Sequence, residues 1–314
     1  MTASLPFHAA ADIHRVLDYV SLVEALRRAF SQGADAPVRH SHAVGPADSG
    51  NVLLLMPAWR AGEAIGVKIV TVFPANQQRG VATVGASYLL LDGATGHPVA
   101  VLEGEALTLR RTGAASALAS SYLSRPDSRV LLVVGAGHLA PYMAAAHCAL
   151  RPIERVLVWG RRPGRAASLA ARLRCAGLPA EPAAELDRAV SEADIVTCAT
   201  TSTEPLVKAG AVRPGTHIDL VGGFTPHMRE ADDALVARAT LFVDTFAGAL
   251  KEAGDLLQPM DRGVIGRDAV VADLAMLVRG AHPGRTTPEE VTLFKSVGAA
   301  LEDLAAARLA IEKL

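Results

Sequence analysis

The segment from Val130 to Ala140 constrains the fold of this chain more than any other stretch. Val130–Val134 is typical of a buried strand, and it runs directly into the sequence G-x-G-x-x-A. In such a loop Gly135 allows a tight turn, Gly137 lets the backbone approach a pyrophosphate, and Ala140 allows close helix packing. The N-terminus of the following helix adds unpaired N–H groups that favour phosphate. We therefore predict a dinucleotide site with Gly135, Ala136, Gly137, His138 and Leu139 as contacts, and a ligand-free strand-to-helix turn as the alternative.

The end of the next predicted strand bears on which dinucleotide would bind. Arg155–Trp159 is followed by Gly160, Arg161 and Arg162. A site for NAD(H) normally has Asp or Glu here, which accepts a hydrogen bond from the ribose 2′-hydroxyl. Two guanidiniums can instead pair with a 2′-phosphate, so the sequence favours NADP(H), with NAD(H) possible. The alternative is a solvated arginine pair at the start of a helix.

Strands and helices alternate after Ser128. Strands are expected at 130–134, 155–159, 195–199, 217–221 and 241–244, with helices from about Leu139 and over 163–174. Such alternation indicates a parallel sheet with helices on both faces. Thr200 and Thr201 would end a strand near the nicotinamide, unless they only form a turn. Apolar spacing over 288–313 predicts one amphipathic helix that returns to the first domain.

The N-terminal part of the chain has a different pattern. A helix is expected over 13–30, with Ser21 as an internal N-cap and Glu24 in capping-box register. Short β-rich runs separated by turns then predict a mainly antiparallel sheet over 52–56, 64–73, 84–91 and 98–102. A helix over 107–123 would place Arg111 in its first turn.

These patterns predict an α/β protein with two domains, which 314 residues are enough to build. One is a Rossmann-type parallel-sheet domain over 123–294. The other is an α+β domain over 1–122 and 295–314, completed by the C-terminal helix.

The charge and cysteine content of the chain disfavour several classes of protein. With 31 Lys+Arg against 32 Asp+Glu, the chain lacks the basic field of a dedicated nucleic-acid binder. Its three cysteines have no C-x-x-C spacing, which disfavours a disulfide framework or a metal site and fits a cytoplasmic protein. The N-terminal Met1–Phe7 lacks the pattern of a signal peptide. The nearly uncharged stretch 129–151 contains glycines and a proline, so we expect a strand, turn and helix and no membrane span.

Three basic residues lie at the edges of predicted elements: Arg39, Lys68 and Arg111. Lys68 stands among Ile65, Val67 and Ile69. Taken alone, it is expected on the solvent face of an alternating strand, and the alternative is a cleft where it meets an anion. His40 and His42 are expected to be surface loop residues, and the alternative is that they face the cleft.

Several ordered motifs resemble the ornithine cyclodeaminase/mu-crystallin family over nearly the whole chain. They are Pro37–Arg39, Val67–Val70, Leu90 to Gly96, Arg111–Ser116, Gly135–Ala140, Asp219–Gly223, Phe294–Gly298 and Ala300–Asp303. The resemblance implies a Rossmann domain, an α+β substrate and dimerisation domain completed by the returning C-terminal helix, and a homodimer.

The resemblance also implies roles for individual residues. Arg39, Lys68 and Arg111 would bind the carboxylate of a small imino or amino acid and form the catalytic set, in which Lys68 is also a candidate for moving a proton. Thr83 would lie near the substrate, Arg111 and Thr112 near the cofactor, and Val297 and Gly298 near the nicotinamide. Three cations converging on one carboxylate would fix its orientation.

One departure from the family pattern bears on the reaction. Cyclodeaminases have an Asp after the Gly-Gly pair, whereas this chain has Phe224 after Gly222-Gly223. Phe224 to Glu230 resembles the reductase members, and Asp219 is no substitute because it belongs to the preceding strand. We therefore expect an enzyme that reduces a small cyclic imino acid, 1-pyrroline-2-carboxylate or 1-piperideine-2-carboxylate, with NADPH. The alternatives are an ornithine cyclodeaminase, an alanine dehydrogenase-type enzyme and a non-catalytic crystallin-like binding protein.

Overall fold

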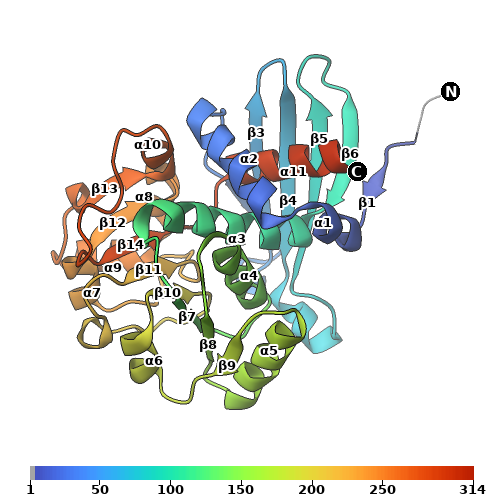
Figure 1. The fold of residues 1–314 in the computed structure, drawn as a ribbon. Coiled ribbons are helices and arrows are strands. Elements are labelled where there is room, and N and C mark those ends of the chain that lie inside the picture. Colours follow the sequence, from blue (N-terminus) through green and yellow to red (C-terminus); the bar gives the residue numbers. More distant parts are fainter. Residues whose placement is uncertain (1–3) are drawn as a thin grey trace. The chain divides into compact units, whose positions relative to one another are not determined.

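The structure is a computed structural model that describes residues 4–314, and its chain divides into two compact units (Figure 1). The first unit comprises the residues up to Thr112 together with Ala299–Leu314, and the second unit is Gly113–Gly298. The predicted boundaries at 122/123 and 294/295 differ from these divisions. The first three residues of the stretch used to judge the signal peptide lie outside the described range.

The first unit contains a six-stranded sheet in the order β1-β6-β5-β4-β3-β2. All neighbours are antiparallel except β1 and β6. The four predicted strands are confirmed, and β1 and β2 extend the sheet at its two edges. The strands are β1 (Phe7–His8), β2 (His40–Ala43), β3 (Val52–Arg60), β4 (Ala64–Val72), β5 (Val84–Asp92) and β6 (Pro98–Glu103). His40 and His42 therefore lie on an exposed edge strand, and the expected surface loop is wrong.

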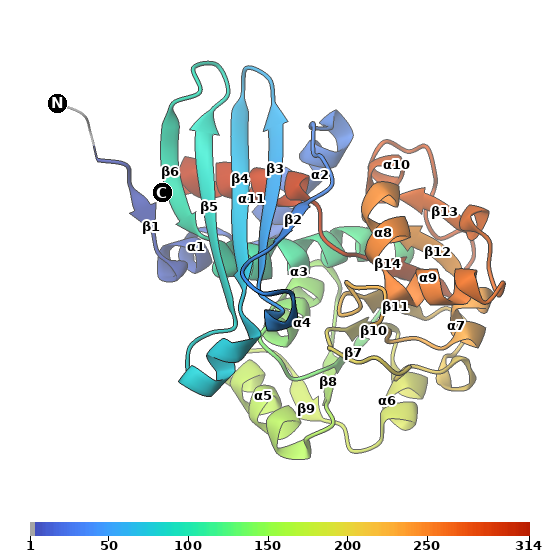
Figure 2. The same cartoon turned by 180° about the vertical axis from the view of Figure 1, so that it is seen from behind.

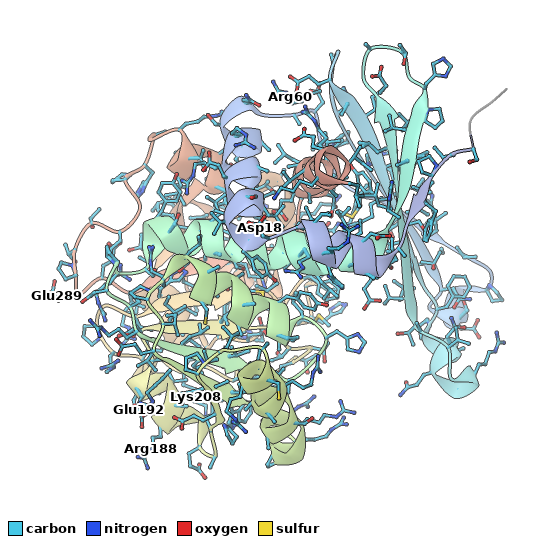
Figure 3. All side chains as sticks on the ribbon, turned by 45° about the vertical axis from the view of Figure 1, so that its right-hand side comes forward. Asp18, Arg60, Arg188, Glu192, Lys208 and Glu289 are labelled. Carbon is cyan, nitrogen blue, oxygen red and sulfur yellow. The ribbon has the colours of Figure 1, made fainter. Side chains whose placement is uncertain are left out.

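Helices cover one face of this sheet (Figure 2). They are α1 (Ala10–Val16), α2 (Tyr19–Gln32) and α11 (Ala300–Lys313), with short 3-10 turns η1 (Ala47–Ser49) and η2 (Pro74–Arg79) in the loops. The predicted first helix is broken at Leu17 and Asp18. Asp18, labelled in Figure 3, is the N-cap of α2, since its carboxylate accepts a hydrogen bond from the Ser21 N–H at 2.9 Å. The predicted cap at Ser21 is wrong because an acceptor three residues earlier satisfies that donor.

Helix α3 (Gly104–Leu123) begins three residues earlier than predicted. The Glu103 carboxylate accepts hydrogen bonds from the N–H groups of Glu105 at 3.0 Å and Ala106 at 2.7 Å. Because of this acidic cap, the helix begins closer to the N-terminus than predicted, at Gly104. Arg111 consequently lies in the helix interior, and its predicted place in the first turn is wrong.

The second unit contains an eight-stranded, fully parallel sheet in the order β13-β12-β14-β11-β10-β7-β8-β9. This confirms the predicted Rossmann-type class. The strands are β7 (Val130–Val134), β8 (Arg155–Trp159), β9 (Ala180–Pro182), β10 (Ile195–Cys198), β11 (His217–Leu220), β12 (Thr240–Val243), β13 (Val270–Asp273) and β14 (Thr292–Lys295). The helices are α4 (Ala140–Leu150), α5 (Pro163–Cys175), α6 (Leu186–Glu192), α7 (Asp233–Arg238), α8 (Phe246–Glu252), α9 (Gly254–Asp261) and α10 (Leu274–Val278), with 3-10 turns η3 (Ala209–Ala211) and η4 (Arg267–Ala269).

Strand β14 overturns the prediction of one long C-terminal helix over 288–313. It lies between β12 and β11, and all four of its residues are buried. A central parallel strand is covered on both faces, so its apolar run resembles a helical pattern. The chain turns at Gly298, which has a φ of +84° that favours glycine, and only then does α11 begin. The predicted return of this helix to the first domain is confirmed, since it packs against α2, β3 and β4.

The uncharged stretch 129–151 forms β7, the glycine loop and α4, which confirms the expected strand, turn and helix. Within residues 4–314, no helix combines the length and apolarity needed to cross a membrane.

Candidate active site

A cleft of about 220 Å³ opens at the carboxyl ends of β7, β8 and β10 in the second unit. Ligands of open parallel sheets bind at such ends. It is lined by Gly135, Ala136, Gly137, Trp159, Gly160, Arg161, Arg162, Arg165, Ala199, Thr200, Thr201, Ser202 and Leu206. The predicted contacts His138 and Leu139 lie in the loop just ahead of α4 and do not line this cleft.

The glycine loop has the geometry that a dinucleotide requires. Gly135 has a φ of +117°, and a Cβ atom there would lie 2.6 Å from the carbonyl oxygen of Ala199. A Cβ at Gly137 would meet no protein atom within 4 Å, so the backbone faces open space. No side chain caps the N-terminus of α4 in the described part of the chain. These features fit a pyrophosphate held by backbone N–H groups.

Three arginines form the basic side of this cleft. Arg161 and Arg162 follow β8, and Arg165 lies in the first turn of α5; all three are exposed. Within the described residues, the cleft lining contains no Asp or Glu. The wall therefore offers charge to a phosphate and no carboxylate to a ribose hydroxyl. Arg165 was not singled out from the sequence, although its position one helical turn after Arg161 and Arg162 was a usable signal.

Thr200 lies in the cleft wall, but its donors point into the protein. Its N–H and hydroxyl both donate to Glu230 Oε1, each at 2.7 Å. Thr201 next to it is exposed. Glu230 was noted in the sequence only as part of a motif, and its contact with Thr200 was missed.

The first unit holds a buried cluster of charges. Lys68 is only 2% exposed, and its Nζ lies 2.7 Å from Asp303 Oδ2 and 3.4 Å from Thr108 Oγ1. Arg111 is also buried and pairs with Glu302 at 2.6 Å and with Asp303 at 3.0 Å. The structure therefore brings two of the three predicted cations together around carboxylates that the sequence analysis had not assigned.

The pleat of β4 explains why Lys68 points inward. Ala64, Gly66 and Lys68 alternate on the buried face, where α11 packs. The expected solvent-facing position of Lys68 is wrong, because Asp303 on α11 compensates its charge. Tyr88 stands opposite Lys68 on β5, and a Cβ at Gly66 would fall 1.9 Å from the Tyr88 hydroxyl oxygen. Gly66 thus makes room for the buried ring.

The electrostatics of this cluster are set by burial and by neighbouring charges. Burial lowers the pKa of Lys68 to about 8; Asp303 opposes the shift, while Arg111 and Arg39 add to it. Burial opposes ionisation of Asp303, yet Lys68 and Arg111 hold its pKa below the ordinary value. Burial, followed by the charge of Asp303, raises the pKa of Tyr88 well above its ordinary value. Arg39 acts on Lys68 electrostatically, so all three predicted cations share one field.

The ion pairs of this cluster join two buried cations, Lys68 and Arg111, to two buried carboxylates, Glu302 and Asp303. Arg39 is half-buried and adds its positive charge to the field at Lys68. Thr112, predicted near the cofactor, is buried one residue after Arg111.

Other predicted residues have structural partners. Thr83 is half-buried at the end of the β4–β5 ladder, where its carbonyl oxygen accepts from the Phe73 N–H at 2.7 Å. The N–H groups of Val297 and Gly298 donate to Asp244 Oδ2 at 2.8 and 2.6 Å. Asp219 is a buried residue of β11, as expected, and accepts from Thr197 at 2.7 Å. Phe224 is 46% exposed.

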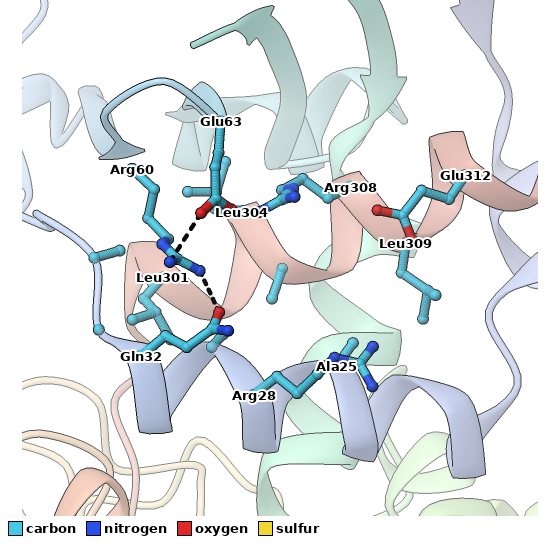
Figure 4. A pocket seen from close by; sticks show the side chains of 14 residues that line it. Ala25, Arg28, Gln32, Arg60, Glu63, Leu301, Leu304, Arg308, Leu309 and Glu312 are labelled. Carbon is cyan, nitrogen blue, oxygen red and sulfur yellow. Dashed lines mark hydrogen bonds and ion pairs between the residues drawn. The ribbon is translucent and has the colours of Figure 1, made fainter.

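A second cavity of about 240 Å³ lies in the first unit, between α2, α11 and the turn after β3 (Figure 4). Arg60 donates to Gln32 and pairs with Glu63 at 2.8 Å, and Arg308 pairs with Glu63 at 2.6 Å. None of the predicted site residues lines it. Within residues 4–314, no three His, Cys, Asp or Glu side chains are grouped to hold a metal ion.

A parallel sheet with a glycine loop at its carboxyl edge, and a separate unit with a buried cation–carboxylate cluster, define the class of two-unit dinucleotide-binding α/β proteins. Within this class, the chain belongs to the ornithine cyclodeaminase/mu-crystallin family, which matches residues 7–314. The resemblance drawn from the motifs is confirmed.

Named relatives refine this placement. A Delta(1)-pyrroline-2-carboxylate reductase of Paracoccus denitrificans is 42% identical over 291 residues, which cover 92% of this chain and 90% of that protein. The Thermococcus litoralis Delta(1)-pyrroline-2-carboxylate reductase, solved with NADH and L-proline, is 37% identical with a TM-score of 0.92, covering 98% of this chain and 97% of that one. An archaeal alanine dehydrogenase dimer with bound NAD is 29% identical with a TM-score of 0.91, covering 98% and 95%.

The charge cluster yields a stability prediction. Asp303→Ala leaves Lys68 and Arg111 buried without their shared partner, so we expect a loss of about 3–5 kcal/mol in the free energy of unfolding at pH 7. Urea denaturation measures it. Glu63→Ala removes exposed ion pairs and should cost about 1 kcal/mol or less.

The pH dependence of this loss follows from the pKa of Asp303. That pKa is lower in the folded than in the unfolded chain, so its contribution is present above about pH 4 and disappears as pH falls through the folded value. Equal losses for Asp303→Ala and Glu63→Ala at pH 7 would contradict the cluster.

Proposed function

We propose that this protein reduces a small cyclic imino acid, of the 1-pyrroline-2-carboxylate or 1-piperideine-2-carboxylate type, with a nicotinamide dinucleotide. The observation that carries the proposal is the buried pair of cations Lys68 and Arg111, held by Asp303 and Glu302, with half-buried Arg39 acting on Lys68 through its charge. The relatives named as Delta(1)-pyrroline-2-carboxylate reductases support the same chemistry.

The residues of the first unit bind and orient the substrate in this proposal. Arg39, Lys68 and Arg111 hold its carboxylate through charge-assisted hydrogen bonds. Burial lowers the pKa of Lys68 to about 8, and Asp303 limits this shift. At neutral pH Lys68 is therefore protonated and acts as a cationic ligand. Thr83, Thr112, Val297 and Gly298 keep the substrate and cofactor roles that the family resemblance implies.

The cleft of the second unit holds the cofactor, which when bound supplies a hydride to the imine carbon. Gly135, Ala136 and Gly137 bind the pyrophosphate through their backbone, with His138 and Leu139 at the helix entry. Thr200 and Thr201 form the wall expected near the nicotinamide.

We further propose that NADP(H) binds better than NAD(H). The known structures named above contain NADH and NAD, so this preference rests on Arg161, Arg162 and Arg165 of this chain. These guanidiniums suit a 2′-phosphate, and the lining residues offer no carboxylate to the 2′-hydroxyl.

The Arg161→Ala variant tests the cofactor preference. We expect the KM for NADPH to rise by about tenfold or more, the effect of losing a hydrogen bond to a charged group, while the KM for NADH changes little. Arg172→Ala on α5, outside the cleft lining, is the matched control and should leave both values unchanged. Equal effects of Arg161→Ala on the two cofactors would exclude a 2′-phosphate contact.

Phe224 separates the proposed reductase from a cyclodeaminase. Cyclodeamination needs proton transfers at the substrate amine in both directions, and a phenyl ring can neither donate nor accept a proton. The wild-type protein should therefore oxidise NADPH with 1-pyrroline-2-carboxylate and release no ammonia from ornithine, measured by absorbance and by an ammonia assay.

The same assays distinguish the proposed reductase from the other candidate functions. Faster oxidation of NADPH with pyruvate plus ammonia would favour the alanine dehydrogenase function, which the archaeal structure makes the second candidate. Conversion of ornithine to proline at a rate that rivals imine reduction would overturn the argument from Phe224. Dinucleotide binding without turnover of any of these substrates would indicate a binding protein.

A homodimer is also proposed, and the uncovered face of the first unit's sheet supports it. Met56, Lys68 and Tyr88 point toward the helices, so Val67 and Ile69 project from the other face, and Ile69 is exposed. A second copy of the chain would cover this apolar face.

Light scattering should give twice the chain mass of 32.7 kDa at micromolar concentration. Ile69→Lys should shift the protein toward monomer, because it places a charge in the proposed interface. A wild-type monomer would contradict the dimer without affecting the proposed reaction.

A further inference from the structure

Glu230 is a fully buried carboxylate that the proposed chemistry does not use. Its Oε1 accepts from the N–H and the hydroxyl of Thr200, and its Oε2 accepts from the Gly222 N–H at 2.8 Å. Thr200 follows β10 and Gly222 follows β11, so one side chain joins the loops at the carboxyl ends of two neighbouring strands.

The loop after β10 belongs to the wall of the cofactor cleft, and Glu230 ties it to the loop after β11. Ala199, Thr200, Thr201 and Ser202 line the cleft, and the carbonyl oxygen of Ala199 lies where a Cβ at Gly135 would collide. The Ser202 N–H in turn donates to Thr200 Oγ1 at 3.2 Å. The position of Thr200 therefore sets the wall that faces the glycine loop.

Gly222 has no room for a side chain at this junction. A Cβ atom there would lie 2.0 Å from the Thr200 carbonyl oxygen and 2.4 Å from Glu230 Oε1. The close approach lets the carboxylate reach both loops at once. The glycine pair 222–223 is therefore explained by the Glu230 contacts as well as by turn formation.

A second carboxylate and a buried lysine hold Glu230 in place. Asp255 Oδ1 accepts from the Glu230 N–H at 2.6 Å, and Asp255 Oδ2 lies 3.2 Å from Lys295 Nζ. A Cβ at Gly223 would fall 2.4 Å from Asp255 Oδ2, so this glycine admits the ion pair. Lys295 pairs with Asp255 and acts on Glu230 through its charge, so these two carboxylates outnumber the buried ammonium by one negative charge when all are ionised.

Such an excess favours the uptake of one proton near neutrality. Burial raises the pKa of Glu230 to about 7; Lys295 opposes the shift, Asp255 adds to it, and the hydrogen bonds from Thr200 oppose it. Asp255 from α9, Lys295 from β14 and Cys198 from β10 are the titratable neighbours, and burial raises the pKa of the Cys198 thiol well above its ordinary value, which keeps it neutral.

Ionisation changes what Glu230 can bind. As a carboxylate it accepts from all three donors, which come from Thr200 and Gly222. A proton removes the negative charge, so the hydrogen bonds from Thr200 and Gly222 lose their charge assistance and become roughly half as strong. The protonated form therefore holds the two loops less tightly.

We propose that Glu230 is a positioning residue whose ionised carboxylate locks the loops after β10 and β11 in the form that binds the dinucleotide. Affinity for the cofactor then increases as pH rises through neutrality. This inference rests on the proposed binding of a nicotinamide dinucleotide in the cleft.

The test measures the Kd of NADPH and of NADH between about pH 6 and 8.5, a range that brackets neutrality. Quenching of tryptophan fluorescence reports binding, since Trp159 lines the cleft. The wild-type Kd should fall by about tenfold as Glu230 ionises, the value of one hydrogen bond to a charged group. E230Q should bind about tenfold more weakly at high pH. NADH lacks the 2′-phosphate, so its profile contains no titration of that phosphate, and subtracting the E230Q profile isolates the part that depends on Glu230.

The control is Asp194→Asn, another change of a buried carboxylate to an amide in the second unit. Asp194 accepts from the N–H groups of Arg129 and Val130, at the amino end of β7 and away from the cleft. This variant should lose stability and keep the wild-type pH profile of binding. A merely structural role for Glu230 predicts that E230Q behaves in the same way.

The outcomes distinguish the two proposals. A wild-type protein that binds neither dinucleotide would overturn the proposed function and with it this role. Wild-type binding with the same pH profile in E230Q would overturn the role of Glu230 alone. If E230Q does not fold, Thr200→Val removes one donor and should weaken binding about threefold to tenfold; unchanged binding would overturn the proposal.

Discussion

The Lys68–Asp303 ion pair is the contact on which the organisation of the first unit depends. Helix α11 is buried along most of its length, including both acidic residues of its first turn. A carboxylate in such a place is tolerated only when a cation and further hydrogen bonds compensate its lost hydration. Lys68 on β4 and Arg111 on α3 supply that compensation, so one cluster fixes strand, helix and C-terminal segment together.

The same need to compensate buried charges organises the second unit, where the carboxylates outnumber the cation. Lys295 at the end of β14 meets Asp255, and Asp255 in turn fixes the backbone of Glu230. Gly222 and Gly223 are small because these carboxylates occupy the space where side chains would lie. The arrangement therefore needs the two glycines, the two carboxylates and the lysine together, although they are far apart in the chain.

The parts of the fold that were predicted correctly from the sequence are those that local patterns determine. The strand, glycine loop and helix over Val130–Leu150 depend on neighbours in the chain, and the hairpins of the first unit are marked by turn residues. Strand β14 was missed because an apolar run buried on both faces has no alternation to distinguish it from a helix. The N-cap of α2 was misplaced by one helical turn because Asp18 and Ser21 are both good caps.

The missing part of the site depends on contacts between distant residues. Arg39, Lys68 and Arg111 could be selected as cations, but the carboxylate partners of Lys68 and Arg111 lie far later in the chain, on α11. A signal was present, since Glu302 and Asp303 interrupt a run of alanines and leucines, where unpaired acids are costly. Glu230 gave a weaker signal, because nothing local indicates that its side chain reaches Thr200.

The two buried clusters differ in their balance of charge. In the first unit, the buried cations Lys68 and Arg111 face the carboxylates of Glu302 and Asp303, so the opposite charges compensate each other. In the second unit, two carboxylates face one ammonium, which favours the uptake of one proton. Under the two proposals, the first cluster holds the carboxylate of the substrate, and pH acts on the cofactor wall through the second cluster.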